Sequence, residues 1–318
     1  MPVPQQWQGR LKLPVIAAPM FLVSGPDLVV ASCQSGIVGS FPALNQRTTE
    51  GFDAWLNEIE SQLKPADAPY GVNLIVHNTN PRLEADLKVC EAHKVPLIIT
   101  SLGAVKDLVD RVHDYGGLVF HDVTTLRHAH KAAEAGVDGL ILVCAGAGGH
   151  AGVISPFALV PEVRAFFDGT IILAGCISDG RGVAAAETMG ADLAYLGTRF
   201  IATKESTAPG DYKAMLADSA AADIVYTPSI SGIPASFLRQ SLINAGLDPK
   251  NLPEKHDINM GEELDTESKA WKNIWSAGQG VGGIADSPTT AQLVERFQHE
   301  YREAIEQMTG RLSAAAAE

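Results

Sequence analysis

The chain has 318 residues, of which 46% are hydrophobic and 19% are charged. This length allows two domains, or one large α/β barrel with an addition, and the apolar content excludes a mainly disordered protein. Lysine and arginine number 24 against 37 aspartates and glutamates, which gives a formal net charge of −13. That acidic balance argues against nucleic acids and anionic membranes as partners.

The cysteines and the first residues predict a cytoplasmic protein. Four cysteines lie far apart and form no Cys-x-x-Cys pair, namely Cys33, Cys90, Cys144 and Cys176. Such usage is typical of a reducing compartment. No basic segment followed by an apolar stretch opens the chain, so no signal peptide is predicted. The longest apolar run, 13–23, contains two prolines and is too short to span a bilayer.

Short, β-branched apolar runs recur through the first two-thirds of the chain, at 13–19, 37–43, 70–76, 96–102, 117–123, 139–145, 170–177 and 193–200. They are continuous rather than alternating, as in strands buried on both faces of a parallel sheet. Amphipathic stretches between them predict helices at 27–35, 52–63, 82–93, 105–114, 126–135 and 182–189. Eight strand–helix units predict an α/β fold of the (β/α)8 TIM barrel type. A doubly wound open sheet is the alternative.

The pattern changes near residue 204. Helical stretches at 211–222 and 235–245 follow, with prolines between them. We therefore predict the barrel over residues 1–205 and a smaller helical insertion or second domain over 206–270. Residues 271–318 hold a glycine-rich segment and an amphipathic helix at 289–307, which we expect to pack back on the barrel.

The ends of the last two predicted strands indicate a phosphate site. In this fold the loops after strands seven and eight form the usual phosphate cradle, and here they hold Gly175, Gly197 and Thr198. Glycine lets backbone N–H groups approach a phosphate closely, and Thr198 adds a hydroxyl. The alternative is that these glycines only permit tight turns.

A histidine in a glycine-rich loop is the second candidate. Gly148 and Gly149 precede His150 after strand six, which leaves the imidazole room to face a ligand. A pKa near neutrality would suit proton abstraction, whereas the alternative is a histidine satisfied within its loop. Cys144 and Cys176 also lie at strand ends, where we expect small buried thiols rather than nucleophiles. No spacing of His, Asp and Glu predicts a metal site.

Five segments in register on these strands resemble the nitronate monooxygenase family, formerly called 2-nitropropane dioxygenases. They are 18–20 (Ala-Pro-Met), 71–74 (Gly-Val-Asn-Leu), 148–152 (Gly-Gly-His-Ala-Gly), 174–175 with 179–182, and 197–200 (Gly-Thr-Arg-Phe). The resemblance covers residues 10–205. It continues at 274–278 (Ile-Trp-Ser-Ala-Gly), which is similar to relatives with a helical second domain.

The resemblance implies an FMN-dependent barrel enzyme that oxidises alkyl nitronates with O₂ to a carbonyl compound and nitrite, with His150 as the catalytic residue. It implies contacts to FMN from Ala18, Pro19, Met20, Asn73, Gly148, Gly149, Gly175, Cys176, Gly197 and Thr198. Asp122 stands in the same cofactor site, where related NAD(P)H:quinone reductases have lysine. Two alternatives stay open: an NAD(P)H-dependent FMN reductase acting on quinones or an enoyl thioester, and a non-catalytic flavin-binding protein.

Overall fold

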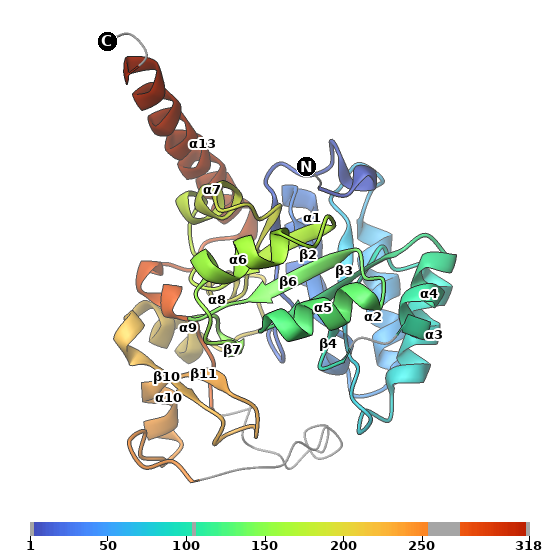
Figure 1. Cartoon of the computed structure of the whole chain (residues 1–318). Helices are drawn as coiled ribbons and strands as arrows, with labels where there is room; N and C mark the ends of the chain where they lie inside the picture. The colour runs from blue at the N-terminus through green and yellow to red at the C-terminus, as the bar shows by residue number, and fades with distance from the viewer. Residues whose placement is uncertain (1–2, 104–105, 254–273, 316–318) are drawn as a thin grey trace.

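A closed barrel of parallel strands forms the body of the molecule (Figure 1). The computed structural model describes residues 3–103, 106–253 and 274–315. Around the barrel the strands are β1 (Val15–Ala17), β2 (Val38–Pro42), β3 (Tyr70–Ile75), β4 (Leu97–Ser101), β5 (Leu118–Val123), β6 (Gly139–Val143), β8 (Thr170–Ala174) and β9 (Leu193–Leu196). β9 pairs with β1 and closes the ring. Each strand lies within one of the apolar runs, so the TIM barrel is confirmed and the open sheet is excluded.

Helices surround the strands (Figure 1): α1 (Pro26–Ser35), α2 (Thr49–Gln62), α3 (Leu83–His93), α4 (Lys106–Asp114), α5 (Leu126–Glu134), α6 (Pro156–Arg164), α7 (Gly180–Thr188) and α8 (Thr198–Ile201). Local chemistry fixes several of their ends. The side chain of Asp179 caps α7 by accepting from the Gly182 N–H, and α1 ends at Gly36 in the left-handed conformation.

Helix α6 lies outside the helices predicted from the sequence. Two prolines in this segment argue against a helix, because proline inside a helix removes a hydrogen bond and clashes with the preceding turn. Pro156 stands at the first helical position, where no N–H donor is needed, and Pro161 is the only proline inside the helix. Buried Leu159, Val160 and Val163 hold α6 against the barrel and offset that cost.

Apolar side chains fill the barrel interior. Ile16, Ile99 and Ile141 belong to a cluster of inward-facing residues from most of the strands. At the amino-terminal end of the strands, Trp7 of η1 (Gln5–Trp7) is 1% exposed, and its ring centroid lies 5.5 Å from that of Phe120. Because the interior is packed and this end is plugged, a ligand can enter only from the carboxyl ends of the strands.

The chain after the barrel holds strands as well as helices. In order it forms α9 (Gly210–Ala217), η3 (Ala221–Asp223), β10 (Ile224–Thr227), β11 (Ala235–Leu238), α10 (Arg239–Asn244) and η4 (Gln279–Gly283). β11 pairs antiparallel with β10 and with β7 (Gly149–His150). The predicted helix at 235–245 is therefore wrong at its start, because pairing on both edges makes that segment a strand. The predicted helical part contains a small antiparallel sheet, and its residues 254–270 lie outside the described residues.

The last helix, α13 (Thr290–Ala315), packs on α1 and α7. Leu293, Val294 and Phe297 are buried there. A Cβ on Gly180 of α7 would lie 2.1 Å from the Phe297 carbonyl oxygen, so only glycine permits this close approach. The far end of α13 projects from the body (Figure 1). Among the described residues, no helix combines the length and the apolar character needed to cross a bilayer.

Candidate active site

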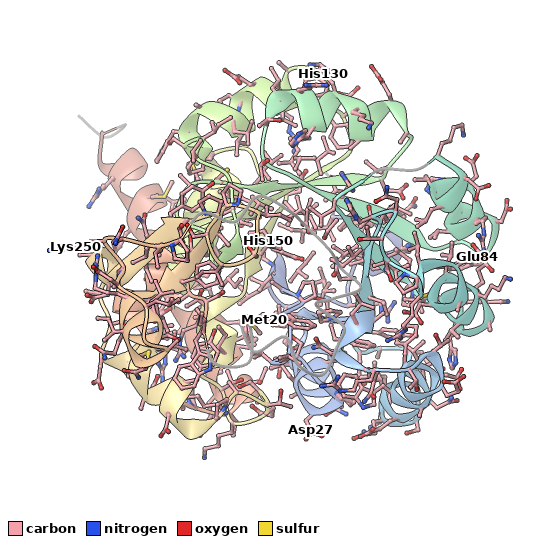
Figure 2. The ribbon with its side chains drawn as sticks, turned by 90° about the horizontal axis from the view of Figure 1, so that it is seen from below. Met20, Asp27, Glu84, His130, His150 and Lys250 are labelled. Atoms are coloured by element: carbon pink, nitrogen blue, oxygen red, sulfur yellow. The ribbon has the colours of Figure 1, made fainter. Side chains whose placement is uncertain are left out.

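A cavity of about 1340 Å³ opens at the carboxyl ends of the barrel strands. Viewed from this end, Met20 and His150 lie toward the middle of the molecule, whereas Asp27 and Glu84 lie at its edge (Figure 2). All residues that the sequence placed in the site line the cavity, namely Ala18, Pro19, Met20, Asn73, Asp122, Gly148, Gly149, His150, Gly175, Cys176, Gly197 and Thr198. The fold therefore brings them together, and their individual roles stay predictions.

The loop after β1 forms one wall and is held rigidly. The Ala18 N–H donates to the Leu196 carbonyl at 2.9 Å, which ties the loop to β9. The Ser24 hydroxyl accepts from the Met20 N–H at 3.0 Å. The side chain of Asn45 donates to the carbonyls of Met20 and Ser24 at 3.0 and 2.8 Å. Pro19 and Met20 are thus presented to the cavity by a preorganised turn.

Glycines from separate loops pack backbone against backbone at the β6, β8 and β9 side of the cavity. A Cβ on Gly278 would lie 2.6 Å from the Gly146 carbonyl oxygen, and one on Gly148 would lie 2.7 Å from the Gly278 nitrogen. The Gly278 N–H donates to the Thr198 hydroxyl at 2.9 Å. With Gly175, whose φ of +128° favours glycine, these segments form the glycine cradle: Gly146, Gly148, Gly175, Gly197 and Gly278.

The contact of Gly278 with the rest of the glycine cradle is not predictable from the sequence. The glycine-rich segment near residue 278 was visible, but nothing in it indicates a contact with Thr198, which lies 80 residues earlier. Stacking fixes the approach of this segment, since the rings of Tyr212 and Trp275 lie parallel with centroids 4.8 Å apart. Only the tertiary fold brings these segments together.

Cys176 differs from the expectation of a buried thiol. It follows Gly175 in the turn that leaves β8, with a left-handed φ of 57°, and its side chain is exposed and lines the cavity. All four cysteines are free thiols, and Cys144 is buried as expected. Partial desolvation of its sulfur by the neighbouring segments raises the pKa of the Cys176 thiol, which disfavours a thiolate nucleophile at neutral pH.

Three polar side chains form a row across neighbouring strands. Asn73 on β3 donates to the Ser101 hydroxyl at 2.8 Å, and Ser101 on β4 donates to Asp122 Oδ2 on β5 at 2.5 Å. Asp122 Oδ1 is buried and has no hydrogen-bond partner among the residues that the structure describes. Burial raises the pKa of Asp122 to about 6. Ser101, which the sequence analysis did not single out, connects the two predicted residues.

We expect Asp122→Asn to change how stability depends on pH. The pKa of Asp122 is raised to about 6, above its unfolded value, so the native state holds an extra proton between about pH 4 and 6. Its contribution to stability is complete below pH 4 and is lost as pH rises through 6, by about 3 kcal/mol. His121, whose pKa burial lowers to about 4, titrates in the same range in both proteins. Urea unfolding at pH 4 and at pH 7 measures the free energy of unfolding of both proteins, and the difference between them gives the contribution of Asp122. An equal difference at both pH values would contradict this prediction.

His150 lies on β7 and is positioned by the small sheet. It pairs with Ala235 of β11, and Gly149 before it has a left-handed φ of 65°. Tyr226 of β10 donates its hydroxyl to the Ala151 carbonyl at 2.8 Å and so fastens the following turn. Desolvation lowers the pKa of His150 to about 4, so the expectation of a pKa near neutrality is wrong. The imidazole is neutral at physiological pH.

Comparison with known proteins identifies the family. A family model described as nitronate monooxygenase matches residues 6–300. The chain belongs to the nitronate monooxygenase family. It is therefore an oxidoreductase of a family whose members use FMN. Among the described residues, no cluster of three His, Cys, Asp or Glu side chains could hold a metal ion.

Individual relatives differ in activity. The nitronate monooxygenase of Paraburkholderia phytofirmans is 28% identical, with 93% of this chain and 94% of that protein covered. A 5-hydroxy-7a-methyl-1-oxo-octahydro-1H-indene-4-carboxyl-CoA dehydrogenase of Rhodococcus jostii is 30% identical over 73% of this chain, and the match spans 64% of that protein, just under two thirds. The solved structure of nitroalkane oxidase from Streptomyces ansochromogenes has a TM-score of 0.81 and 26% identity, with 95% and 99% of the two chains covered.

Proposed function

We propose that this protein is an FMN-dependent nitronate monooxygenase, which oxidises alkyl nitronates with O₂ to a carbonyl compound and nitrite. The observation that carries this proposal is a neutral His150 facing the same cavity as the glycine cradle. A neutral imidazole keeps one N–H group, which can donate a hydrogen bond to an oxygen of an anionic nitronate. The family and the nitronate monooxygenase relative support the same reading.

The cradle suits the single terminal phosphate of FMN. Its glycines bring bare backbone close to the ligand, and Thr198 adds a hydroxyl. Short-range N–H donors are needed here because the net charge of −13 offers an anion no attraction at a distance. Ala18, Pro19 and Met20 would then lie against the ring, with Asn73 as a hydrogen-bond donor. Bound FMN would supply the electron acceptor that no side chain of the protein provides.

The cofactor is expected to be held without a covalent bond. None of the contacts in the cradle requires a linkage through cysteine or histidine. Unfolding the purified yellow protein in guanidinium and filtering it should therefore release FMN quantitatively, identified by chromatography against FMN and FAD standards. Recovery of FAD, or flavin that stays with the unfolded chain, would contradict the assignment.

We expect the polar residues of the site to have different roles. His150 would bind and orient the nitronate oxygens by hydrogen bonding. Because its pKa is about 4, it is a weak base for deprotonating a neutral nitroalkane. We therefore expect the preformed nitronate, which is already carbanionic, to be the better substrate. Asp122, held by Ser101, would present a carboxyl group in the same cavity, where the quinone reductases have lysine.

A second candidate is an NAD(P)H-dependent FMN reductase that acts on a quinone or an enoyl thioester. Two observations favour it. The cavity of about 1340 Å³ exceeds the roughly 300–1,000 Å³ of common ligand pockets, so it has room for a larger partner beside a flavin. One relative is a dehydrogenase of a carboxyl-CoA compound, which is also a thioester.

Anaerobic mixing separates these candidates. The purified protein is mixed with ethyl nitronate, and separately with NADH and NADPH, while the flavin absorbance is followed. Bleaching by the nitronate alone is the expected result, followed by nitrite release when O₂ is admitted. Rapid bleaching by a pyridine nucleotide would select the reductase. A flavin that none of the three reduces would indicate a flavin-binding protein without this catalysis.

A further inference from the structure

One side of the cavity mouth is apolar over four neighbouring strands. Phe21 and Leu22 follow β1, Leu44 follows β2, Ile75 ends β3 and Leu102 follows β4, and all five line the cavity. We call these residues the apolar arc. Three of them are exposed although they are large: Phe21 by 36%, Leu22 by 43% and Leu102 by 37%. They gather at one opening instead of being scattered over the surface, which distinguishes them from ordinary exposed apolar residues.

Polar side chains line another part of the cavity, beyond the apolar arc. Thr124 follows β5, and His128 and Lys131 of α5 also line the opening. His150 on β7 and Asp122 on β5 add further polar groups, and Asp122 accepts from Ser101, the residue before Leu102. The cavity therefore offers a ligand both hydrocarbon, along the apolar arc, and hydrogen-bonding groups, among them His150.

Two members of the apolar arc hold strained backbone. Leu22 has a φ of 57° and Leu102 a φ of 64°, in the left-handed region that branched and bulky residues avoid. This conformation is unfavourable for a residue with a Cβ, which approaches the following carbonyl oxygen too closely. Neither leucine recovers that cost by burial, because both side chains stay exposed. Strain retained beside a cavity is a pointer to function.

Hydrogen bonds fix these leucines in place. The Leu22 N–H donates to Asn45 Oδ1 at 2.9 Å, and the Leu22 carbonyl accepts from the Thr207 hydroxyl at 3.0 Å. Leu102 follows Ser101, whose carbonyl accepts from the Val76 N–H at 2.8 Å. The backbone is thus held at Leu22 itself and at the residue before Leu102, which lowers the backbone entropy lost when a ligand binds there.

We propose that the apolar arc is a binding subsite for the hydrocarbon body of the substrate, and that the substrate is an amphiphile with a small planar anionic head and an extended alkyl or alicyclic body. The head lies toward His150 and the body lies along Leu22 and Leu102. The identity of the head as a nitronate rests on the proposed function. The hydrocarbon subsite does not, because it depends only on the arc.

The test uses unreactive planar anions of graded length. Propanoate, hexanoate and decanoate are titrated into the FMN-loaded protein by isothermal calorimetry. We expect affinity to rise about two- to fourfold per added methylene, because each methylene leaves water for the apolar arc. Affinity that is independent of length in the wild-type protein would overturn the proposal.

Asparagine variants locate the subsite. Leu22→Asn and Leu102→Asn remove the apolar side chain while asparagine tolerates the left-handed backbone, so the fold is preserved. In the double variant, decanoate should bind at least tenfold more weakly and propanoate should change less than twofold. The control is Ile243→Asn on α10, where an apolar side chain is 47% exposed outside the cavity, and it should change neither.

Two results would separate this proposal from the proposed function. Unchanged decanoate binding in the double variant, or equal weakening of decanoate and propanoate, would reject the apolar arc as the subsite. Failure of ethyl nitronate to reduce the flavin, with the graded binding intact, would reject the nitronate head and leave the hydrocarbon subsite standing.

Discussion

Gly278→Ala is expected to lower the affinity for FMN at least tenfold and to lower the melting temperature of the protein. The new Cβ would lie 2.6 Å from the Gly146 carbonyl oxygen and 2.8 Å from the Gly148 nitrogen. Both neighbours are backbone atoms and cannot rotate away, so the loop after β6 and the segment before η4 must separate. That movement also breaks the hydrogen bond from the Gly278 N–H to Thr198. A cradle that has opened no longer aims its N–H groups at one point.

A matched control lies four residues further along the same segment. A Cβ on Gly282 would meet nothing closer than 3.9 Å, and its backbone has no positive φ. Gly282→Ala should therefore leave both properties within error, since surface substitutions of this kind change stability by less than about 0.5 kcal/mol. Quenching of FMN fluorescence on titration into apoprotein measures affinity, and calorimetry measures the melting temperature. Equal behaviour of the two variants would show that the cradle is not where FMN binds.

The barrel could be read from the sequence because each of its strands is buried on both faces. Such strands are continuous apolar runs, and that signal is local. The errors occurred where tertiary contacts decide the structure. Residues 235–238 become β11 because β7 and β10 offer edges to pair with. The helix α6 forms despite Pro161 because buried Leu159 and Val163 outweigh the proline.

In the candidate site, too, features set by the local sequence were predicted and features set by tertiary contacts were not. The residues predicted from motifs at strand ends all line the cavity, because a closed parallel barrel gathers those ends in one place. Ser101 was missed because its role depends on lying between Asn73 and Asp122 across three strands. The pKa of His150 was misjudged because desolvation, which lowers it, arises only when the chain has folded around the imidazole.

His150→Asn is expected to fold and to retain FMN, but to lower kcat/KM for a preformed alkyl nitronate about 10²-fold. Asparagine keeps a hydrogen-bond donor but places it differently, and loss of one well-aimed donor to a developing charge typically costs about 10²–10³-fold. The matched control is His130→Asn, an exposed histidine of α5 that does not line the cavity, which should change kcat/KM less than twofold. Nitrite release under fixed oxygen measures both.

The pH dependence then identifies what His150 does. With a pKa of about 4, His150 stays neutral from pH 5.5 to 9, so the wild-type profile on a nitronate should show no inflection from this group. A general base is most effective when its pKa lies near the working pH, so His150 should contribute little to deprotonating a neutral nitroalkane. The loss in His150→Asn should therefore be the same on nitronate and nitroalkane. A loss on the nitroalkane nearer 10⁴-fold, with an inflection between pH 6 and 7 in the wild-type profile that is absent from His150→Asn, would show instead that His150 abstracts the proton.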